Sequence, residues 1–365
     1  MTANSRTVLW WGRFDPDYSR NRIVRKLFAE QGWSIVDFRP TLSRLGALEA
    51  RLKGVSPPDL VWVPCFRQRD ARAATAWARS VGAPVAFDPL ISAYDKQVFE
   101  RARLKPDSAG ARRLLAWEQS IFCGVDLVFA DTGEHLRYFA DIMQVPEKRL
   151  ALLPVGAEES LFYPAPLPPL EEGPLEVLFF GSFIGLQGPE WIVQAARCYH
   201  GPPVTWRLLG EGPLLARCKA LAEGMGNVAF EPWLAYEALP SRIHQAHILL
   251  GIFGTSVKAG RVIPNKVYQA LACGRPVITR GSDAYPEAVT GDPDSGISWV
   301  APGSPEGLAG AVAELASHPE RLPGRGKAAA ATYAGNFGNR AIGACLLAAL
   351  SRLGLESPPG GRGKP

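Results

Sequence analysis

The 365-residue sequence lacks the marks of several large classes of protein. No stretch approaches the roughly 18 consecutive apolar residues of a transmembrane helix, and the N-terminus has no long apolar segment like that of a signal peptide. Heptad and triplet repeats are missing, which excludes coiled-coil and collagen-like chains. The formal net charge of +5 is small for a dedicated nucleic-acid-binding protein. We therefore expect a soluble, at most peripheral, globular protein without a nucleic-acid partner.

Metal and cofactor motifs are equally scarce. The six cysteines are scattered without a CxxC pair, which argues against a zinc site or a disulfide framework and favours reduced thiols in the cytoplasm. The Asp-x-Asp pairs at Asp15–Asp17 and Asp292–Asp294 each enclose a proline and are typical of turns. No GxGxxG motif with a downstream acidic residue is present. We expect neither a metal nor a cofactor.

Short apolar segments recur along the chain and alternate with helical patterns. In residues 19–32, Ile23, Val24, Leu27 and Phe28 share one helical face, with Ser19 as the expected N-cap and Gly32 at the end. Segments that are apolar on both faces are typical of buried parallel strands. The pattern predicts an α/β fold with two doubly wound, Rossmann-like domains. The expected strands are 8–11, 34–38, 60–65, 84–88, 127–131, 151–155, 176–180, 205–209, 228–233, 248–253, 276–280 and 297–300.

A proline-rich stretch marks the expected domain boundary. Residues 164–174 hold five prolines, which neither a helix nor a central strand accommodates. The apolar helix near the C-terminus needs a partner surface, and we expect it to return to the first domain. The predicted divisions are an N-terminal domain 1–163, a linker 164–174, a C-terminal domain 175–337, a returning helix 338–356 and a disordered tail 357–365.

Candidate site residues follow the first-half strands, because open α/β sheets bind ligands beyond the carboxyl ends of their strands. Gly12 and Arg13 follow the first strand. Arg20 and Arg22 lie in the next helix's first turn, where cations oppose the macrodipole, so they either meet an anion or point into water. Asp88 ends a later strand; it either orients an acceptor hydroxyl or forms a turn before proline.

Glycines and one aromatic residue mark the corresponding positions in the second half. Gly181 and Ser182 follow one strand, and the segment Gly210-Glu211-Gly212 follows the next. Glycine allows the backbone to approach a ligand closely, although a tight turn alone would also explain it. Trp233, just past a third strand, either packs against a nucleobase or belongs to the core.

The strongest local signal is VIPNKVYQALACGRPVIT, residues 262–279. Pro264 suits the first position of a helix and Gly274 the position after its end, which predicts a short helix over 264–273. Lys266 lies in the first turn, and Lys258 and Arg261 precede it. These cations either bind a diphosphate or form a solvated basic loop.

Taken together, the second-half motifs resemble the donor domain of the retaining GT-B glycosyltransferases of family 4, the glycosyl transferases group 1. The resemblance rests on LLGEGPLLARCKALA (208–222), on 227–253, and on VYQALACGRPVIT followed by YPEAV (285–289), all in family order. It covers residues 175–320 well and the first half more loosely. Two departures stand out: Arg261 and Gln269 occupy the positions of two family glutamates, and Ser182 and Gln187 those of a basic pair.

The resemblance implies a GT-B fold and metal-independent transfer of a sugar, with retention, from a UDP- or GDP-sugar to a hydroxyl of a glycan or lipid-linked acceptor. It places the protein in glycan, polysaccharide or glycolipid biosynthesis, in the cytoplasm or at the inner face of the membrane. Asp88 and Lys266 are the expected catalytic residues. The expected donor-binding residues are Gly12, Arg13, Gly181, Ser182, Gly210, Glu211, Gly212, Trp233, Arg261, Asn265, Lys266 and Gln269.

Several alternatives remain open at this point. The lost glutamates and basic pair are compatible with a catalytically silent nucleotide-sugar-binding protein, and the fold also serves nucleotide-sugar epimerases. Five basic residues either form a membrane-facing surface for a lipid-linked acceptor or a solvated helix surface. These residues are Arg101, Arg103, Lys105, Arg112 and Arg113.

Overall fold

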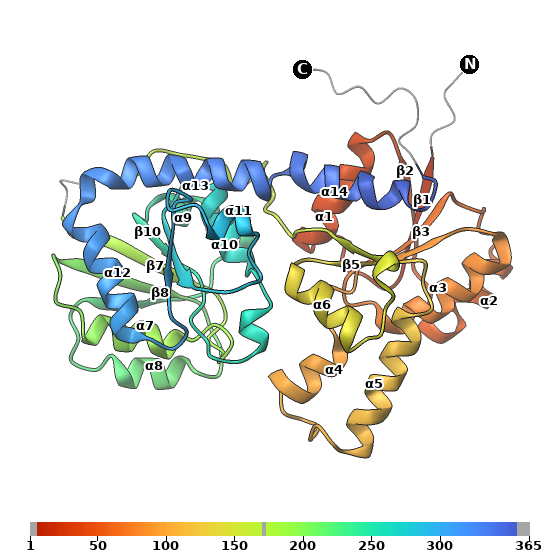
Figure 1. Cartoon of the computed structure of the whole chain (residues 1–365), viewed down its shortest axis with the longest axis horizontal. Coiled ribbons are helices and arrows are strands. Elements are labelled where there is room, and N and C mark those ends of the chain that lie inside the picture. The colour runs from red at the N-terminus through yellow and green to blue at the C-terminus, as the bar shows by residue number, and fades with distance from the viewer. Residues whose placement is uncertain (1–5, 170–172, 356–365) are drawn as a thin grey trace. The chain divides into compact units, whose positions relative to one another are not determined.

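The structure, a computed structural model, describes residues 6–169 and 173–355. The chain divides into two compact units, the first formed by residues 1–155 and 342–365 and the second by residues 156–341 (Figure 1). Each unit has a six-stranded sheet in which every recorded strand pair is parallel, flanked by helices. The prediction of two doubly wound α/β domains is confirmed.

The sheet of the first unit has the strand order β2-β1-β3-β4-β5-β6. Its strands are β1 (Thr7–Trp11), β2 (Ser34–Phe38), β3 (Leu60–Val63), β4 (Val85–Phe87), β5 (Leu127–Ala130) and β6 (Leu150–Leu152). Its helices are α1 (Ser19–Glu30), α2 (Gly46–Leu52), α3 (Gln68–Val81), α4 (Ala93–Asp95), α5 (Ala109–Phe122), α6 (Gly133–Asp141) and most of α14 (Asn339–Ser351). Short helical turns include η1 (Ser43–Leu45) and η2 (Lys96–Glu100).

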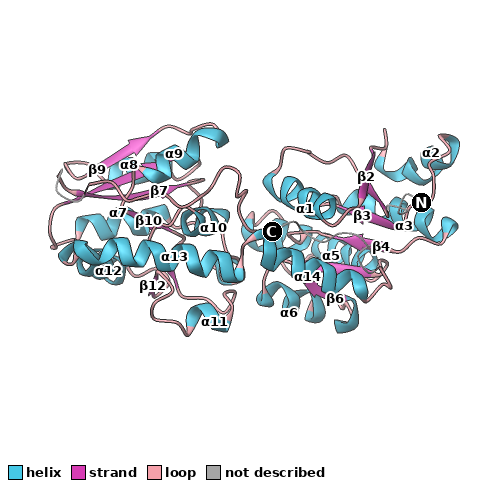
Figure 2. Cartoon of the chain, turned by 90° about the horizontal axis from the view of Figure 1, so that it is seen from above, coloured by secondary structure: helices cyan, strands magenta, loops and turns pink. Residues whose placement is uncertain are grey.

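The sheet of the second unit has the order β12-β11-β10-β7-β8-β9. Its strands are β7 (Leu175–Phe180), β8 (Val204–Leu209), β9 (Val228–Glu231), β10 (Ile248–Leu250), β11 (Val277–Arg280) and β12 (Ile297–Val300). Its helices are α7 (Pro189–Arg197), α8 (Leu215–Leu221), α9 (Leu239–His244), α10 (Asn265–Ala272), α11 (Glu287–Thr290), α12 (Pro305–Ser317) and α13 (Leu322–Asn336), and the turn η5 (Lys258–Gly260) precedes α10. Figure 2 shows helices on both sides of these strands.

Both faces of strands β3, β4 and β5 of the first sheet are buried, which explains why they are apolar on both sides, whereas the edge strand β2 exposes Ser34, Val36 and Asp37. On one face Trp10 stacks on Trp62 with ring centroids 5.5 Å apart, and Phe28 of α1 packs edge-on against both indoles. Residues of α14, including Ile342 and Leu346, complete this cluster. The C-terminal helix thus supplies apolar side chains to the core of the first unit. In the part of the chain that the structure describes, no helix is long and apolar enough to cross a membrane.

The division between the units differs from the expected one. It falls at 155/156, and the described part of the expected linker 164–174 belongs to the second unit. The reason is Arg275, which is buried and donates hydrogen bonds to the carbonyl oxygens of Ala165 and Pro166, at 2.7 and 2.8 Å. Residues 170–172 and the predicted disordered tail lie outside the described residues.

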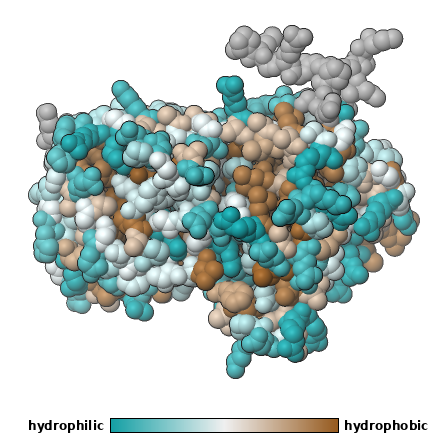
Figure 3. All heavy atoms as spheres, in the orientation of Figure 1, coloured by the Kyte–Doolittle hydropathy of each residue, from teal (hydrophilic) through white to brown (hydrophobic). Residues whose placement is uncertain are grey.

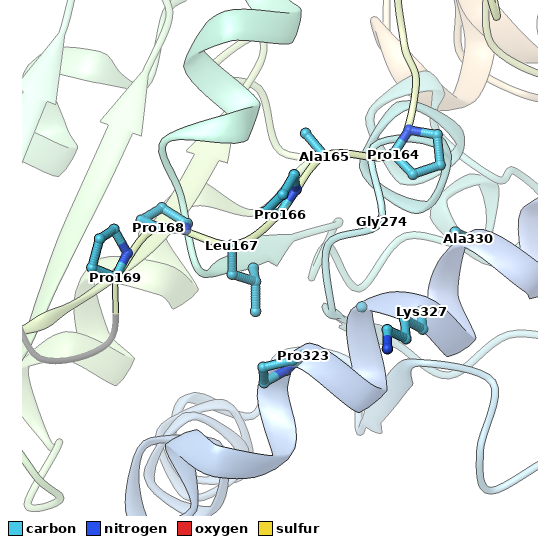
Figure 4. A pocket seen from close by; sticks show the side chains of 11 residues that line it. Pro164, Ala165, Pro166, Leu167, Pro168, Pro169, Gly274, Pro323, Lys327 and Ala330 are labelled. Carbon is cyan, nitrogen blue, oxygen red and sulfur yellow. The ribbon is translucent and has the colours of Figure 1, made fainter.

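The proline-rich segment also forms one wall of a groove of about 900 Å³ (Figure 4). Leu167 points from this wall toward α13, which carries Pro323 and Lys327. The groove reaches Gly274, at the C-terminal end of α10 and therefore about 12 Å from that helix's N-terminus.

Candidate functional site

The second sheet has a topological switch point between β7 and β10. From β7 the chain proceeds outward to β8 and β9, whereas β10, β11 and β12 lie on the other side of β7. The helices that follow β7 and β10 therefore diverge, and the crevice beyond the carboxyl ends of these strands is where open α/β sheets bind ligands. Gly181 and Ser182 follow β7 directly, and the loop after β10 leads into η5 and α10.

Lys266 extends from the first turn of α10 to the carboxyl end of β7. Its Nζ lies 3.5 Å from the ring centroid of Phe179, at the end of β7, and donates a hydrogen bond to Gln187 Oε1. A Cβ placed on Gly181 would lie 2.9 Å from the same Nζ, so the glycine leaves the room that the ammonium group occupies. The lysine is 5% exposed, and burial lowers its pKa well below the ordinary value. A buried amino group is thus held at the carboxyl end of β7.

The start of α10 differs by one residue from the sequence-based expectation. The helix spans Asn265–Ala272, and Pro264 is its N-cap residue with an extended backbone, rather than its first helical residue. Pro264 accepts the hydrogen bond from the Val267 amide at 2.9 Å. Lys266 stays within the first turn, whose amides are not used by the helix itself, so its predicted place is retained.

The glycines after β8 are explained by packing between two loops. A Cβ on Gly210 would lie 2.0 Å from the carbonyl oxygen of Gly181, and one on Gly212 would lie 2.7 Å from the Phe183 backbone. The Phe183 amide also donates to the carbonyl oxygen of Glu211 at 2.7 Å. The open, positive-φ backbone at these positions therefore brings the loops after β7 and β8 into direct contact.

Three further predicted donor-binding residues have exposed side chains. Ser182 and Glu211 are exposed at the ends of β7 and β8. Trp233, just after β9, is 50% exposed, which rules out the alternative of a core tryptophan. β9 is the second strand from β7, so the indole stands about 10 Å along the sheet from the switch point. The exposed indole of Trp233 is therefore accessible for stacking by a planar aromatic ligand.

The remaining predicted residues lie around α10. Gln269 is 5% exposed and lies one turn after Lys266, on the same helical face. Asn265 and Arg261 are half-buried. Arg280, the last residue of β11, was not among the predicted site residues. Its Nη1 donates a hydrogen bond to the carbonyl oxygen of Gly254, in the loop after β10, at 2.7 Å. Its position at a strand end next to the switch point was the signal that could have identified it.

In the first unit, Gly12 and Arg13 lie at the carboxyl end of β1. Gly12 has a φ of 143°, and a Cβ there would lie 3.1 Å from Cγ of Arg67. The backbone of Arg13 is held on both sides: its amide donates to Asp70 Oδ2 at 3.3 Å, and its carbonyl oxygen accepts from Arg67. The side chain of Arg13 is exposed. The turn is therefore ordered while the guanidinium faces solvent.

Asp88 is not the open carboxylate that its strand-end position suggested. It is 1% exposed, and both of its oxygens accept hydrogen bonds from Arg20, from Nε at 2.7 Å and from Nη2 at 2.9 Å. Arg20 also donates to the carbonyl oxygens of Leu153 and Pro154, both at 3.0 Å. Burial by itself would lower the pKa of Arg20, but the carboxylate of Asp88 raises it, so the guanidinium stays charged.

This ion pair also corrects the expectation for Arg20, which neither faces water nor waits for an anion. A buried guanidinium needs a carboxylate and several carbonyl oxygens to compensate for lost hydration, and β4 and the segment after β6 provide them. Near this ion pair lies a second buried pair of polar side chains, Asp131 and His135, which was not predicted from the sequence. Asp131, directly after β5, is hydrogen-bonded through Oδ1 to His135 Nδ1 at 2.5 Å, and both residues are buried.

The two Asp-x-Asp pairs are turns, as predicted. The Asp17 amide donates to Asp15 Oδ1, and the Asp294 amide donates to Asp292 Oδ1, both at 2.9 Å. Within residues 6–169 and 173–355, no group of three or more histidine, cysteine, aspartate or glutamate side chains is arranged to hold a metal ion.

Comparison with known proteins gives two family matches that follow the two halves of the chain. Residues 11–156 match the glycosyl transferase 4-like domain, and residues 174–318 match the glycosyl transferases group 1. A curated relative, the putative colanic acid biosynthesis glycosyl transferase WcaI of Escherichia coli, is 31% identical over 116 residues. That match spans 30% of this chain and only 27% of the relative.

Solved structures share the whole fold at low sequence identity. HepE of Anabaena, in complex with UDP, superposes with a TM-score of 0.70 at 14% identity, covering 95% of this chain and 99% of that one. The sucrose-phosphate synthase of Thermosynechococcus elongatus also has a TM-score of 0.70, at 18% identity, covering 96% and 99%. The chain thus has the GT-B fold, and its two halves match, in order, the glycosyl transferase 4-like domain and the glycosyl transferases group 1.

Proposed function

We propose that the protein transfers a sugar, with retention of configuration, from a UDP- or GDP-sugar to a hydroxyl of a glycan or lipid-linked acceptor. The observation that carries the proposal is the buried Lys266 at the switch point of the second sheet. Similarity supports it: HepE binds UDP, and WcaI is named for colanic acid biosynthesis. We place the reaction in glycan, polysaccharide or glycolipid biosynthesis, in the cytoplasm or at the inner face of a membrane.

In this reaction the bond between the sugar's anomeric carbon and the diphosphate oxygen breaks, and the electron pair leaves with the diphosphate. The acceptor oxygen forms the new bond to the anomeric carbon, and its hydroxyl proton passes to the departing diphosphate. Lys266 would stabilise the charge that develops on the diphosphate, with the Ser182 amide and the amides at the start of α10 as further donors. Trp233 would pack against the base, Gln269 would bind the ribose, and Arg261 would lie near the sugar. No metal is required in this scheme, because the cation is a side chain of the protein.

We assign Asp88 a positioning role. With both carboxylate oxygens bound to Arg20, it would order the strand ends that receive the acceptor rather than touch the acceptor itself. The alternative of a silent nucleotide-sugar-binding protein is favoured by Ser182 and Gln187, which stand where the family has a basic pair. Lys266 donates a hydrogen bond to Gln187 there. Donor hydrolysis measured beside donor binding separates the two: binding without any turnover supports the silent alternative.

A thermal-shift screen with UDP, GDP, uridine and guanosine tests the donor site. A ligand at about 100 times its dissociation constant should stabilise the protein by about 2.7 kcal/mol. Trp233→Ala should weaken binding of the preferred nucleoside and its diphosphate by the same factor, roughly 5- to 10-fold, because stacking on the exposed ring contributes to both. Tyr163→Ala, which removes another exposed aromatic ring of the same unit, is the control. Unchanged binding in Trp233→Ala would remove the indole from the base site.

Diphosphate binding should depend on pH through Lys266. Because burial lowers the pKa of this lysine, the empty site loses its charge at a lower pH than an exposed lysine would. A bound diphosphate favours the charged form, so affinity should be greatest below the pKa of Lys266 and fall as the pH rises through it. Titration calorimetry in buffers of different ionisation enthalpy should show proton uptake on binding. Lys266→Met should abolish both the uptake and the slope; a slope that persists would assign it to another group.

A further inference from the structure

The helix α2 of the first unit exposes its large apolar side chains. Leu45, Leu48 and Leu52 recur with spacings of three and four residues, a stripe that in most surface helices faces the core. Here these leucines are 52%, 54% and 79% exposed, and Leu42, just before η1, is 55% exposed. We call these four residues the leucine face. Figure 3 shows apolar surface at the right-hand edge of the molecule, where α2 lies in Figure 1.

The orientation of α2 follows from the small residues on its opposite side. Gly46 packs so closely that a Cβ there would lie 3.1 Å from the Trp11 ring and 3.2 Å from Pro40. Ala50 is fully buried in the same core cluster as Trp11. The helix therefore packs against Trp11 and α3 through the side that carries this glycine and alanine, which leaves its leucines directed outward. If the helix were rotated to bury its leucines, a leucine would have to occupy the narrow space beside Trp11 that Gly46 now fills.

The surroundings of the leucine face are positively charged. Arg44 and Arg51 are exposed beside it. The acidic residue of the segment 41–53, Glu49, accepts from the Thr41 amide at 2.8 Å and from Lys53 Nζ at 2.7 Å, so Lys53 balances its charge. The two arginines are then in excess, and the surface presents leucine and arginine together.

We propose that the leucine face docks on the surface of an anionic phospholipid bilayer. Leucines reaching the boundary between head groups and acyl chains, flanked by arginines at the level of the phosphates, form a standard interfacial arrangement. A second copy of this chain fits less well, because the like charges of Arg44 and Arg51 would meet across the interface. A protein partner also fits less well, since leucine is under-represented in protein hot spots and residues 41–53 contain no aromatic side chain.

This surface is different from the basic segment that the sequence suggested as membrane-facing. Arg101, Arg103 and Lys105 are exposed and follow η2, where Phe99 is 54% exposed, in the connection between α4 and α5. That segment has one large exposed apolar side chain beside its cations, whereas the leucine face has four. The proposal does not depend on the glycosyltransferase reaction, since it concerns association with lipid alone.

Flotation of the full-length protein with phosphatidylglycerol–phosphatidylcholine vesicles tests the proposal. The L48Q/L52Q variant should bind at least about tenfold more weakly than the wild type, because both leucines would otherwise be withdrawn from water. R44Q/R51Q should weaken binding to anionic vesicles and remove most of its dependence on salt. I142Q is the matched control, because Ile142 is an apolar residue of the same unit that is 39% exposed. Circular dichroism and UDP or GDP binding should be unchanged in all variants.

Three outcomes would overturn the proposal. The first is wild-type protein that does not float with anionic vesicles. The second is equal flotation of wild type and L48Q/L52Q, with loss in F99Q/R101Q instead, which would assign the contact to the segment after η2. The third is a wild-type molar mass that rises with protein concentration, together with a monomer mass for L48Q/L52Q at every concentration. That result would make the leucine face an interface between copies. The proposed function fails separately, if neither the wild type nor any variant binds UDP or GDP. In that case a loss of flotation in L48Q/L52Q would still support the membrane contact.

Discussion

Replacing Lys266 with alanine should weaken binding of the nucleoside diphosphate by roughly 10- to 150-fold. The basis is its position: a buried ammonium group beside Gly181, at the carboxyl end of β7, with Gln187 as its hydrogen-bond acceptor. A charge-assisted contact contributes about 1.5–3 kcal/mol to binding, which corresponds to that range of affinity. The bare nucleoside should bind almost equally well to both proteins, because it lacks the diphosphate. Isothermal titration calorimetry with both ligands measures the difference.

Two controls separate a binding effect from damage to the fold. Lys266→Met keeps the length of the side chain without its charge. Because burial disfavours the charged form of this lysine, the methionine variant should unfold at a denaturant concentration no lower than that of the wild type. Lys266→Arg keeps the charge and should retain more affinity than methionine. Equal losses for nucleoside and diphosphate would indicate a damaged domain, and no loss for either would exclude Lys266 from the donor site.

Asp88→Asn should destabilise the first unit by about 3–5 kcal/mol, because it leaves the guanidinium of Arg20 buried without its carboxylate. The effect should appear as an earlier unfolding transition in urea for the domain that contains both residues. Arg20→Ala should cost a similar amount, since it leaves the carboxylate unpaired instead. Both variants should show weaker turnover mainly through loss of folded protein.

The double variant Arg20→Met/Asp88→Leu is the decisive control for this pair. Removing both charges together eliminates the uncompensated ion, so most of the lost stability should return. A stable double variant with near-normal donor binding and reduced turnover would support the positioning role of Asp88. Asp88→Asn with unchanged unfolding would contradict the structural ion pair, and a stable double variant without any turnover would restore a direct catalytic role.

Secondary structure and local motifs were predictable because the information is local. A segment apolar on both faces is buried on both faces, as VLWW in β1 and LVWV in β3 show, and parallel pairing follows. The place of Lys266 in the first turn of α10 was also predictable, since Pro264 marks the start of this helix and Gly274 follows its end. Twelve strands and the strand-end positions of the candidate residues were therefore accessible from the sequence.

The partners of these residues were decided only in the tertiary structure. Arg20 and Asp88 are 68 positions apart, and no local pattern indicates that a helix cation and a strand-end carboxylate meet in the core. The proline-rich segment reads as a linker, yet Arg275, more than a hundred positions later, binds it to the second unit. Leucines at this spacing usually face a core, but the close packing of Gly46 on Trp11 directs those of α2 outward. Which segments form strands and helices, and which residue types stand at the strand ends, follow from local sequence alone, because both depend on neighbouring residues. Which charges are neutralised, and which apolar faces stay uncovered, depends on contacts between distant segments and was settled by their packing.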